Sequence, residues 1–279
     1  MGRRSRPRRE ARSTAPQPGS SLTTVRAVIE YDGTDFCGFQ PNPTVRTVGA
    51  VLEAVLLSLF RETVKVSCAG RTDTGVHATG QVVSFRTTRS FPFDRLALAL
   101  NSELPHDLTV RETAIVDDGF SARFDALERS YVYAIFNRRP PSALLARNAY
   151  HVWAPLDLDA MRQAAQYVVG AHDFRSFCGM LPDGGVTLRT VRSLTLEARG
   201  DLIRLQISAD GFLHRMVRTI VGTLIECGSG KRKPESISDV LQARSRAAAG
   251  LTAPAQGLYL AGVRYPGGFD SYREPPIFS

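Results

Sequence analysis

Cys68-Ala69-Gly70-Arg71-Thr72-Asp73-Thr74-Gly75-Val76-His77-Ala78-Thr79-Gly80-Gln81 is a polar stretch with an apolar segment on each side. On its N-terminal side, residues 64–68 alternate apolar and polar side chains, which is typical of a half-buried strand. On its C-terminal side, residues 82–85 begin a second strand. The stretch has three glycines and no proline, so it can turn tightly and hold its polar side chains in fixed directions. We therefore expect a short loop between two strands, around which the rest of the chain is arranged.

Asp73 is the carboxylate that this loop presents, two residues from the cation Arg71. A short loop that uses three glycines to present one carboxylate is a candidate functional site. The alternative is an Asx-turn, in which Asp73 only caps its own loop. An arbitrary Asp-Thr-Gly triplet is more often such a turn, so a functional assignment needs support from other residues.

Wider matches supply that support. Gly70-Arg71-Thr72-Asp73-x-Gly75-Val76-His77-Ala78 resembles the catalytic loop of the TruA-type tRNA pseudouridine synthases, and the resemblance extends from about residue 24 to residue 265. The other matching stretches are Tyr31-Asp32-Gly33-Thr34, Gly38-Phe39-Gln40, Phe120-Ser121-Ala122-Arg123-Phe124, Arg129-Ser130-Tyr131-Val132-Tyr133, residues 212–222 and Gly257-Leu258-Tyr259-Leu260. Thr74 stands where the family usually has Ala, and Phe39 where it usually has Trp. Both departures are conservative in size or character.

The resemblance implies a reaction and a role for four residues. Uridine becomes pseudouridine when its N1–C1′ bond breaks and the base rejoins the sugar through C5. This isomerisation transfers no group and changes no oxidation state, so it requires no nucleotide, flavin or metal cofactor. The family pattern makes Asp73 the catalytic residue and Arg218 its ion-pair partner. It places Tyr131 against the target base and Arg71 near the flipped-out nucleotide.

The resemblance also implies partners. The substrate would be tRNA, and the bacterial-type length with few insertions favours positions 38, 39 and 40 of the anticodon stem-loop. Relatives of the same fold modify other tRNA uridines, and no residue of this chain decides between these substrates. Family members of this length form homodimers, so a homodimer is expected here.

Arg218 has a second, independent argument. On a helix predicted over residues 212–227 it borders an apolar side formed by Val221, Gly222 and Ile225. A cation in such a place is costly unless a carboxylate pairs with it, and Asp73 brought across a cleft would do so. The alternative is an arginine that extends to solvent or binds phosphate.

Tyr131 begins a strand predicted over residues 129–136, where a tyrosine can also be an ordinary core residue. Tyr133 points to the same face, and we expect it to take that core role. We expect His77 and His214 to make structural hydrogen bonds in or beside the cleft rather than to act as acid or base.

Apolar periodicity predicts strands at residues 24–31, 64–69, 81–87 and 109–116 and helices at 48–60 and 94–103. The second half repeats this order, with strands at 129–136, 191–198, 202–209 and 258–265, helices at 157–169 and 212–227, and an added helix near 234–249. The pattern predicts an α+β fold of two ferredoxin-like (βαββαβ) halves, and the resemblance implies antiparallel sheets that meet around a central cleft. The N-terminal half, residues 23–125, would carry the Asp73 loop, and residues 126–268 would form the C-terminal half. Residues 269–279 would be a tail, and residues 138–148 a hinge region.

Composition limits the class of protein. A chain of 279 residues with 43% apolar side chains can bury one large core or two smaller ones. No apolar run reaches the ~18 residues of a membrane span, and the start has no apolar signal segment. We therefore expect a cytoplasmic protein without membrane association. Four cysteines without C-x-x-C spacing and five scattered histidines suggest neither a disulfide framework nor a metal site.

The net charge of +8 is unevenly distributed. Residues 1–20 hold six arginines and one glutamate and have no hydrophobic period, so residues 1–22 are predicted to be a disordered, Arg-rich tail. That tail either assists RNA binding or is only solvated. A distributed RNA footprint is expected elsewhere, with candidates Arg26, Arg86, Arg89, Arg123, Arg138, Arg139, Arg215 and the Lys231-Arg232-Lys233 run.

Two other classes of protein compete with a pseudouridine synthase. Asp73-Thr74-Gly75 is the triplet of aspartic proteases, but those enzymes need two aspartates that share a proton. The triplet occurs once here, beside an arginine that would disrupt such a pair. A non-catalytic RNA-binding module on the same scaffold is the second alternative. Retained tRNA binding by an inactive wild-type protein would favour it.

Overall fold

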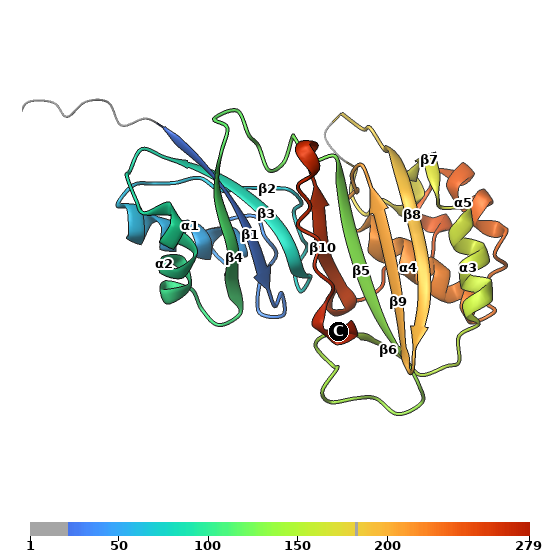
Figure 1. Ribbon diagram of the computed structural model, residues 1–279. Helices are drawn as coiled ribbons and strands as arrows, with labels where there is room; N and C mark the ends of the chain where they lie inside the picture. Colours follow the sequence, from blue (N-terminus) through green and yellow to red (C-terminus); the bar gives the residue numbers. More distant parts are fainter. Residues whose placement is uncertain (1–21, 182–183) are drawn as a thin grey trace, which may run out of the picture.

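The computed structural model describes residues 22–181 and 184–279, so the predicted Arg-rich tail lies outside the described residues except for Leu22. The first part of the chain contains β1 (Thr23–Tyr31), α1 (Val48–Phe60), β2 (Ser67–Cys68), β3 (His77–Thr87), α2 (Leu96–Glu103) and β4 (Leu108–Val116). The second part contains β5 (Glu128–Asn137), β6 (Tyr150–Val152), α3 (Leu158–Gln166), β7 (Gly170–Asp173), β8 (Leu188–Arg199), β9 (Leu202–Ala209), α4 (Met216–Gly228), α5 (Ser236–Ala243) and β10 (Leu258–Arg264). Figure 1 shows these elements side by side in one elongated molecule.

The strands form one ten-stranded sheet in the order β4-β1-β3-β10-β5-β9-β8-β7, with β2 on β3 and β6 on β5. Most neighbours are antiparallel, and the parallel pairs are β3 with β10 and β5 with β6. The order in the first part is β4-β1-β3-β2, and the second part repeats it as β10-β5-β9-β8. The predicted α+β class with mainly antiparallel strands is therefore confirmed. The two parts share a single continuous sheet, joined where β3 lies parallel to β10.

Each face of the sheet has its own apolar core. On β5, Tyr131, Tyr133 and Ile135 belong to the main core, together with buried residues of all five α-helices. The residues between them point the opposite way, as successive strand residues must. They join a smaller core that includes Phe278 from the C-terminal segment. Helices thus cover one face, and C-terminal residues cover part of the other (Figure 1).

Several predicted elements have different bounds in the structure. The helix predicted from residue 212 begins at Met216, because Arg215 has a left-handed backbone (φ 60°) that precedes the first helical turn. The helix predicted over 234–249 is divided into α5 and a short 3₁₀ turn at Arg246–Ala248. The strand predicted over 64–69 is only the two-residue β2. Strand β3 begins at His77, before the predicted residue 81, because its first residues pair with distant β10.

Residues 138–148 are not a hinge between the parts. They connect β5 to β6, and these two strands pair with each other in the second part. The chain crosses from the first part to the second between β4 and β5, at residues 117–127. The sequence favoured 138–148 because of its prolines, although both strands beside it belong to one part.

The four cysteines are all free thiols, with Cys37 exposed and the other three buried. Burial raises the pKa of Cys68 and Cys227 to about 11, so both remain protonated at neutral pH. Within residues 22–181 and 184–279, no three His, Cys, Asp or Glu side chains group as a metal site would. In the same residues, no helix combines the length and apolar character needed to cross a membrane.

Candidate active site

Side chains of β1 and β3 form hydrogen bonds that fix the loop that carries Asp73. Gln81 binds both backbone groups of Gly70: its Oε1 accepts from the N–H at 3.3 Å, and its Nε2 donates to the carbonyl at 2.6 Å. The hydroxyl of Tyr31 forms a hydrogen bond with the hydroxyl of Thr72 at 2.8 Å. Burial raises the pKa of Tyr31 well above its ordinary value, so the phenol stays neutral. The loop is therefore held rigidly on the sheet.

The three glycines of the loop serve different purposes. Gly75 has φ +77°, a left-handed backbone that glycine adopts without strain. Gly80 allows a close approach, since a Cβ there would lie 2.2 Å from the carbonyl oxygen of Ala261 on β10. An added Cβ at Gly70 would lie 3.4 Å from the hydroxyl of Tyr131, which is an ordinary van der Waals contact. Only the first of the three is needed for an unusual backbone angle.

Asp73 and Arg218 form an ion pair across the two parts of the molecule, as the sequence predicted. Nη1 of Arg218 donates to Oδ2 of Asp73 at 3.0 Å. Nε of Arg218 donates to the carbonyl of Ala253 at 2.8 Å, so the planar guanidinium is held at two points. The Arg218 side chain is 14% exposed and that of Asp73 is 26% exposed. Such a half-buried, charge-assisted hydrogen bond is stronger than a surface pair.

The other carboxylate oxygen of Asp73 has fewer contacts. Nε2 of His214 lies 3.8 Å from Oδ1, which is too long for a hydrogen bond. Within the described residues, Oδ1 accepts no hydrogen bond. The neighbours of Asp73 are thus a cation and an imidazole rather than a second carboxylate. This arrangement lacks the aspartate pair of an aspartic protease.

Asp73 lies between two adjoining cavities. The larger has a volume of about 740 Å³ and is lined by the Asp73 loop, the start of β5 and the segment before α4. Its charged lining consists of six arginines and two aspartates: Arg71, Arg123, Arg129, Arg189, Arg215, Arg218, Asp73 and Asp210. The smaller cavity, about 390 Å³, shares Asp73, His214, Arg215 and Arg218 with it. A concave site with this excess of cations suits a polyanion.

Tyr131 lines the larger cavity and packs edge-on against Phe212, with ring centroids 5.1 Å apart. Burial, with smaller contributions from Tyr31 and Asp73, raises the pKa of Tyr131 well above its usual value. Its phenol is therefore neutral at physiological pH. Tyr133 is fully buried and donates to the carbonyl of Pro254 at 2.7 Å, so the predicted core role is confirmed. Arg71 is an exposed residue on the lining.

A family model described as tRNA pseudouridine synthase matches residues 27–125 and 164–266. The chain belongs to this family. The tRNA pseudouridine synthase A of Halalkalibacterium halodurans is 46% identical over 231 residues, which cover 82% of this chain and 88% of the relative. Proteins of the same name from Acetivibrio thermocellus and Brevibacillus brevis are 42% and 45% identical over 244 residues, covering 88% of this chain and 100% of each relative.

Sequence reasoning did not identify one important arginine of this pseudouridine synthase. Arg129 donates to four backbone carbonyls, those of Ala69, Arg123, Ala126 and Asp210, at 2.6–3.2 Å. Burial lowers the pKa of Arg129 from its usual value, yet an arginine stays charged. Because carbonyls and not carboxylates bind it, its charge adds to the field of the cavity. No local pattern of the sequence signals this role, because it depends on backbone carbonyls from segments that are far apart in the chain.

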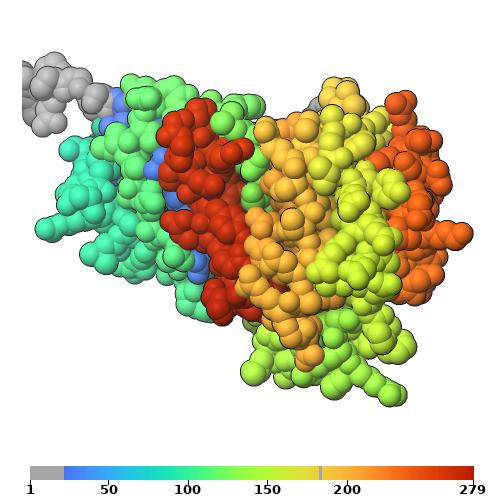
Figure 2. Space-filling model, turned by 45° about the vertical axis from the view of Figure 1, so that its right-hand side comes forward, coloured from blue at the N-terminus to red at the C-terminus, as the bar shows by residue number. Residues whose placement is uncertain are grey.

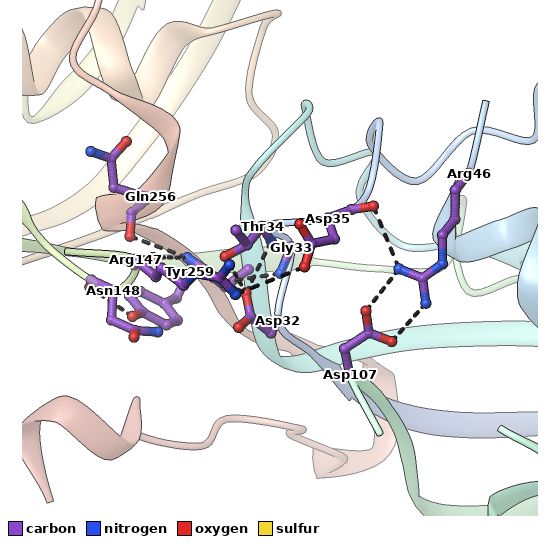
Figure 3. A network of polar contacts seen from close by, with 11 residues as sticks. Asp32, Gly33, Thr34, Asp35, Arg46, Asp107, Arg147, Asn148, Gln256 and Tyr259 are labelled. Atoms are coloured by element: carbon purple, nitrogen blue, oxygen red, sulfur yellow. Dashed lines mark hydrogen bonds and ion pairs between the residues drawn. The ribbon is translucent and has the colours of Figure 1, made fainter. Parts of the chain in front are cut away.

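His77 is the predicted structural histidine, and it connects the two parts. Figure 3 labels its partners Gly33, Arg147 and Gln256. Its Nδ1 accepts from the backbone N–H of Gly33 at 3.0 Å, while Nε2 lies 3.0 Å from the carbonyl of Arg147 and 3.2 Å from that of Gln256. The neutral tautomer with a proton on Nε2 satisfies all these groups. Burial lowers the pKa of His77, although Asp32, 3.1 Å from Nδ1, acts in the opposite direction. The ring also stacks on Tyr259 of β10, with centroids 4.8 Å apart.

Proposed function

We propose that this protein isomerises uridine to pseudouridine at positions 38, 39 and 40 of the tRNA anticodon stem-loop, with Asp73 as the catalytic residue. Its family membership makes it an isomerase that acts on tRNA uridine. The observation that carries the proposal is the Asp73–Arg218 pair, whose members come from distant segments and meet in a cavity lined by arginines. A carboxylate held by an arginine suits a reaction that needs a nucleophile or a charge-stabilising group.

The chemistry requires a carboxylate, a group that removes the C5 proton, and space for the flipped base. The glycosidic N1–C1′ bond breaks, the base turns, a C5–C1′ bond forms, and the C5 proton leaves as N1 becomes protonated. Arg218 holds Asp73 by one oxygen, so the other remains available to attack the substrate or to stabilise positive charge. The target uridine must first leave its stack, and the 740 Å³ cavity is large enough to accept a flipped base.

Tyr131 and Arg71 would handle the flipped nucleotide. Tyr131 is aromatic, neutral and part of the lining of the larger cavity, so it suits stacking on the target base. Its raised pKa makes it a poor base in the free enzyme, which favours stacking over proton abstraction. Arg71, exposed at the same cavity, would occupy space near the displaced nucleotide or contact its phosphate.

The remaining proposals concern domain organisation, cellular compartment and oligomeric state. The repeated strand order supports two ferredoxin-like halves, residues 23–125 and 126–268. The free thiols fit a reducing compartment and so a cytoplasmic enzyme. A homodimer would let one tRNA contact both subunits. Sedimentation of the active protein as a monomer at micromolar concentration would contradict it.

The test of the proposed function uses anticodon stem-loop RNA with tritium at C5 of a single uridine. Transcripts would carry that uridine at position 38, 39 or 40, with a fourth that places it elsewhere in the loop. Purified wild-type protein is expected to release tritium from the first three only, because the C5 proton leaves during isomerisation. Binding without tritium release from any transcript would instead support a non-catalytic RNA-binding module. Release from the fourth transcript would indicate a different set of target uridines.

A further inference from the structure

Phe124 is an exposed aromatic residue at the larger cavity. Its side chain is 79% exposed, although it lies on the lining of the same cavity as Asp73. Most phenylalanines of this protein are buried or partly buried, whereas Phe124 belongs to neither apolar core. A lone exposed apolar residue needs no explanation in general. An exposed phenylalanine on the lining of a cavity that holds Asp73 and six arginines does need an explanation.

The turn that carries Phe124 is rigid. Ala122 is fully buried, its N–H donates to the hydroxyl of Ser84 at 3.0 Å, and its carbonyl accepts from the hydroxyl of Tyr265 at 2.6 Å. Two further bonds connect Ser121 and Asp125: a carboxylate oxygen of Asp125 accepts from the Ser121 N–H at 2.8 Å, and the Asp125 N–H donates to the Ser121 carbonyl at 3.1 Å. The backbone beside Phe124 is thus fixed on both sides, so the ring projects from an anchored position at the cavity.

Arg129 connects this turn to the catalytic loop. Its guanidinium donates to the carbonyl of Arg123 at 2.6 Å and to the carbonyl of Ala69 at 3.1 and 3.2 Å. Ala69 lies at the start of the loop that presents Asp73, so one partly buried cation contacts both segments. The guanidinium of Arg123 lies over the Phe124 ring at 5.3 Å from its centroid. The ring of Phe124 and the guanidinium of Arg123 thus form a partly cationic surface on a turn that Arg129 connects to the Asp73 loop.

We propose that Phe124 stacks on the base next to the target uridine after that uridine has flipped into the cavity. The proposal rests on the proposed function and adds a positioning residue to it. Flipping removes the stacking partner of the neighbouring base, and an exposed ring at the cavity can replace it. Arg123, stacked on the other side of the ring, would contact the adjoining phosphate. A nucleic acid fits this surface better than a protein because the arginines around Phe124 outnumber the aspartates.

The kinetic test compares substitutions that separate aromatic stacking from apolar contact. Phe124→Ala and Phe124→Leu are both expected to lower kcat/KM, by roughly 5- to 150-fold for Ala, the range that base stacking on an aromatic side chain supports. Phe124→Tyr and Phe124→Trp should retain most of the activity. Unfolding temperatures should not change, because the side chain is exposed. Trp153→Ala is the matched control, since Trp153 is 69% exposed and lies on neither cavity.

A fluorescence test reports on the contact directly. The chain has one tryptophan, so Phe124→Trp in a Trp153→Phe background places a single indole at the cavity. Saturating anticodon stem-loop RNA should quench its emission, as stacking on a base does. Unchanged emission, or full activity of Phe124→Leu, would overturn the proposal. So would a loss of activity that follows a change in sedimentation, which would make Phe124 a subunit contact. Tritium release by the wild type in the same series tests the proposed function separately.

Discussion

At the scale of single residues, the site depends on how Arg218 divides its hydrogen bonds. One guanidinium nitrogen binds Asp73 and another binds the carbonyl of Ala253, so the same group fixes its own location and that of the carboxylate. The pair was predicted mainly from the family resemblance, and an arginine that borders the apolar side of a helix gave it further support because such a cation needs a partner. The sequence could not predict Arg129 or Phe124, whose importance depends on contacts with backbone and cavity that no local pattern encodes.

Arg218→Ala is expected to lower the single-turnover rate by about 10²-fold or more while tRNA affinity changes little. Arg218→Lys should be strongly impaired too, because an ammonium group cannot bind Asp73 and the Ala253 carbonyl in the same planar geometry. The measurement is pseudouridine formation at saturating anticodon stem-loop RNA, with a melting curve to establish that each variant is folded.

Arg189→Ala provides the contrast for this prediction. Arg189 lines the same cavity, and within the described residues no carboxylate pairs with it. Its loss should weaken binding, reduce the salt dependence of binding by about one charge, and leave the saturated rate nearly unchanged. If Arg218→Ala shows that same pattern, Arg218 is a docking residue and its pairing with Asp73 has no catalytic importance.

At the scale of elements, the beginnings of β3 and α4 determine where the functional residues lie. Periodicity predicted most helices and strands, since their apolar faces are local features of the sequence. It placed the start of β3 too late because His77 and Ala78 pair with β10, far along the chain. It placed the start of α4 too early because Phe212 and Leu213 extend the apolar pattern of the helix, and nothing local indicates the left-handed Arg215.

The start of β3 also predicts a pH dependence of stability. The pKa of His77 is lower in the folded protein than its ordinary value of about 6.5. Between about pH 6.5 and the lower pKa of the folded protein, His77 is protonated in the unfolded chain but stays neutral in the folded protein. The free energy of unfolding therefore falls as the pH falls. Wild-type protein should therefore lose stability from about pH 7 downward toward the lowered pKa of His77. Urea unfolding at closely spaced pH values measures this loss.

His77→Gln should remove that pH-dependent component, although it should also lower stability at neutral pH by breaking the contacts with Gly33, Arg147 and Gln256. His106→Gln is the control, because His106 is exposed. If wild type and His77→Gln show the same slope of stability between pH 7 and 5, the neutral tautomer assigned to His77 is wrong.

At the scale of the whole molecule, the C-terminal segment reinforces the junction between the two parts. Strands β3 and β10 pair over only two residue pairs, Tyr259 with His77 and Leu260 with Ala78. Residues 269–279 cross this junction, where the hydroxyl of Ser271 donates to the carbonyl of Gly80 at 2.7 Å and the Arg273 N–H donates to that of Ala261 at 2.9 Å. Figure 2 shows the C-terminal residues filling the space between the two sets of strands. The sequence suggested a simple tail, because a segment with two adjacent prolines and no apolar period gives no sign of where it packs.

A buried ion pair anchors this segment and supports a stability prediction. Arg204 of β9, 6% exposed, donates to both carboxylate oxygens of Glu274 at 2.5 and 2.9 Å. Burial would raise the pKa of Glu274, but hydrogen bonds from Arg204 and Tyr272 hold it below its usual value. Glu274→Gln should lower the free energy of unfolding by ~2–4 kcal/mol at neutral pH, since it leaves Arg204 without its counter-charge. Denaturant unfolding measures the change.

The exposed Glu197–Arg199 pair on β8, 3.6 Å apart, is the control for this effect. Glu197→Gln should change stability by less than about 0.5 kcal/mol. Equal effects of the two substitutions would mean that the segment is not anchored through Arg204. A stable Glu274→Gln variant with reduced single-turnover rate would in turn show that the anchor acts on the Asp73–Arg218 geometry.

The central claim is that Asp73 performs the reaction, and Asp73→Asn tests it most directly. The amide keeps the shape of the carboxylate but cannot act as a nucleophile or an anion. Single-turnover measurements with excess enzyme and C5-tritiated anticodon stem-loop RNA should show binding within a few fold of wild type and no tritium release. Tritium release at even a few per cent of the wild-type rate would contradict the assignment of Asp73 as the catalytic residue.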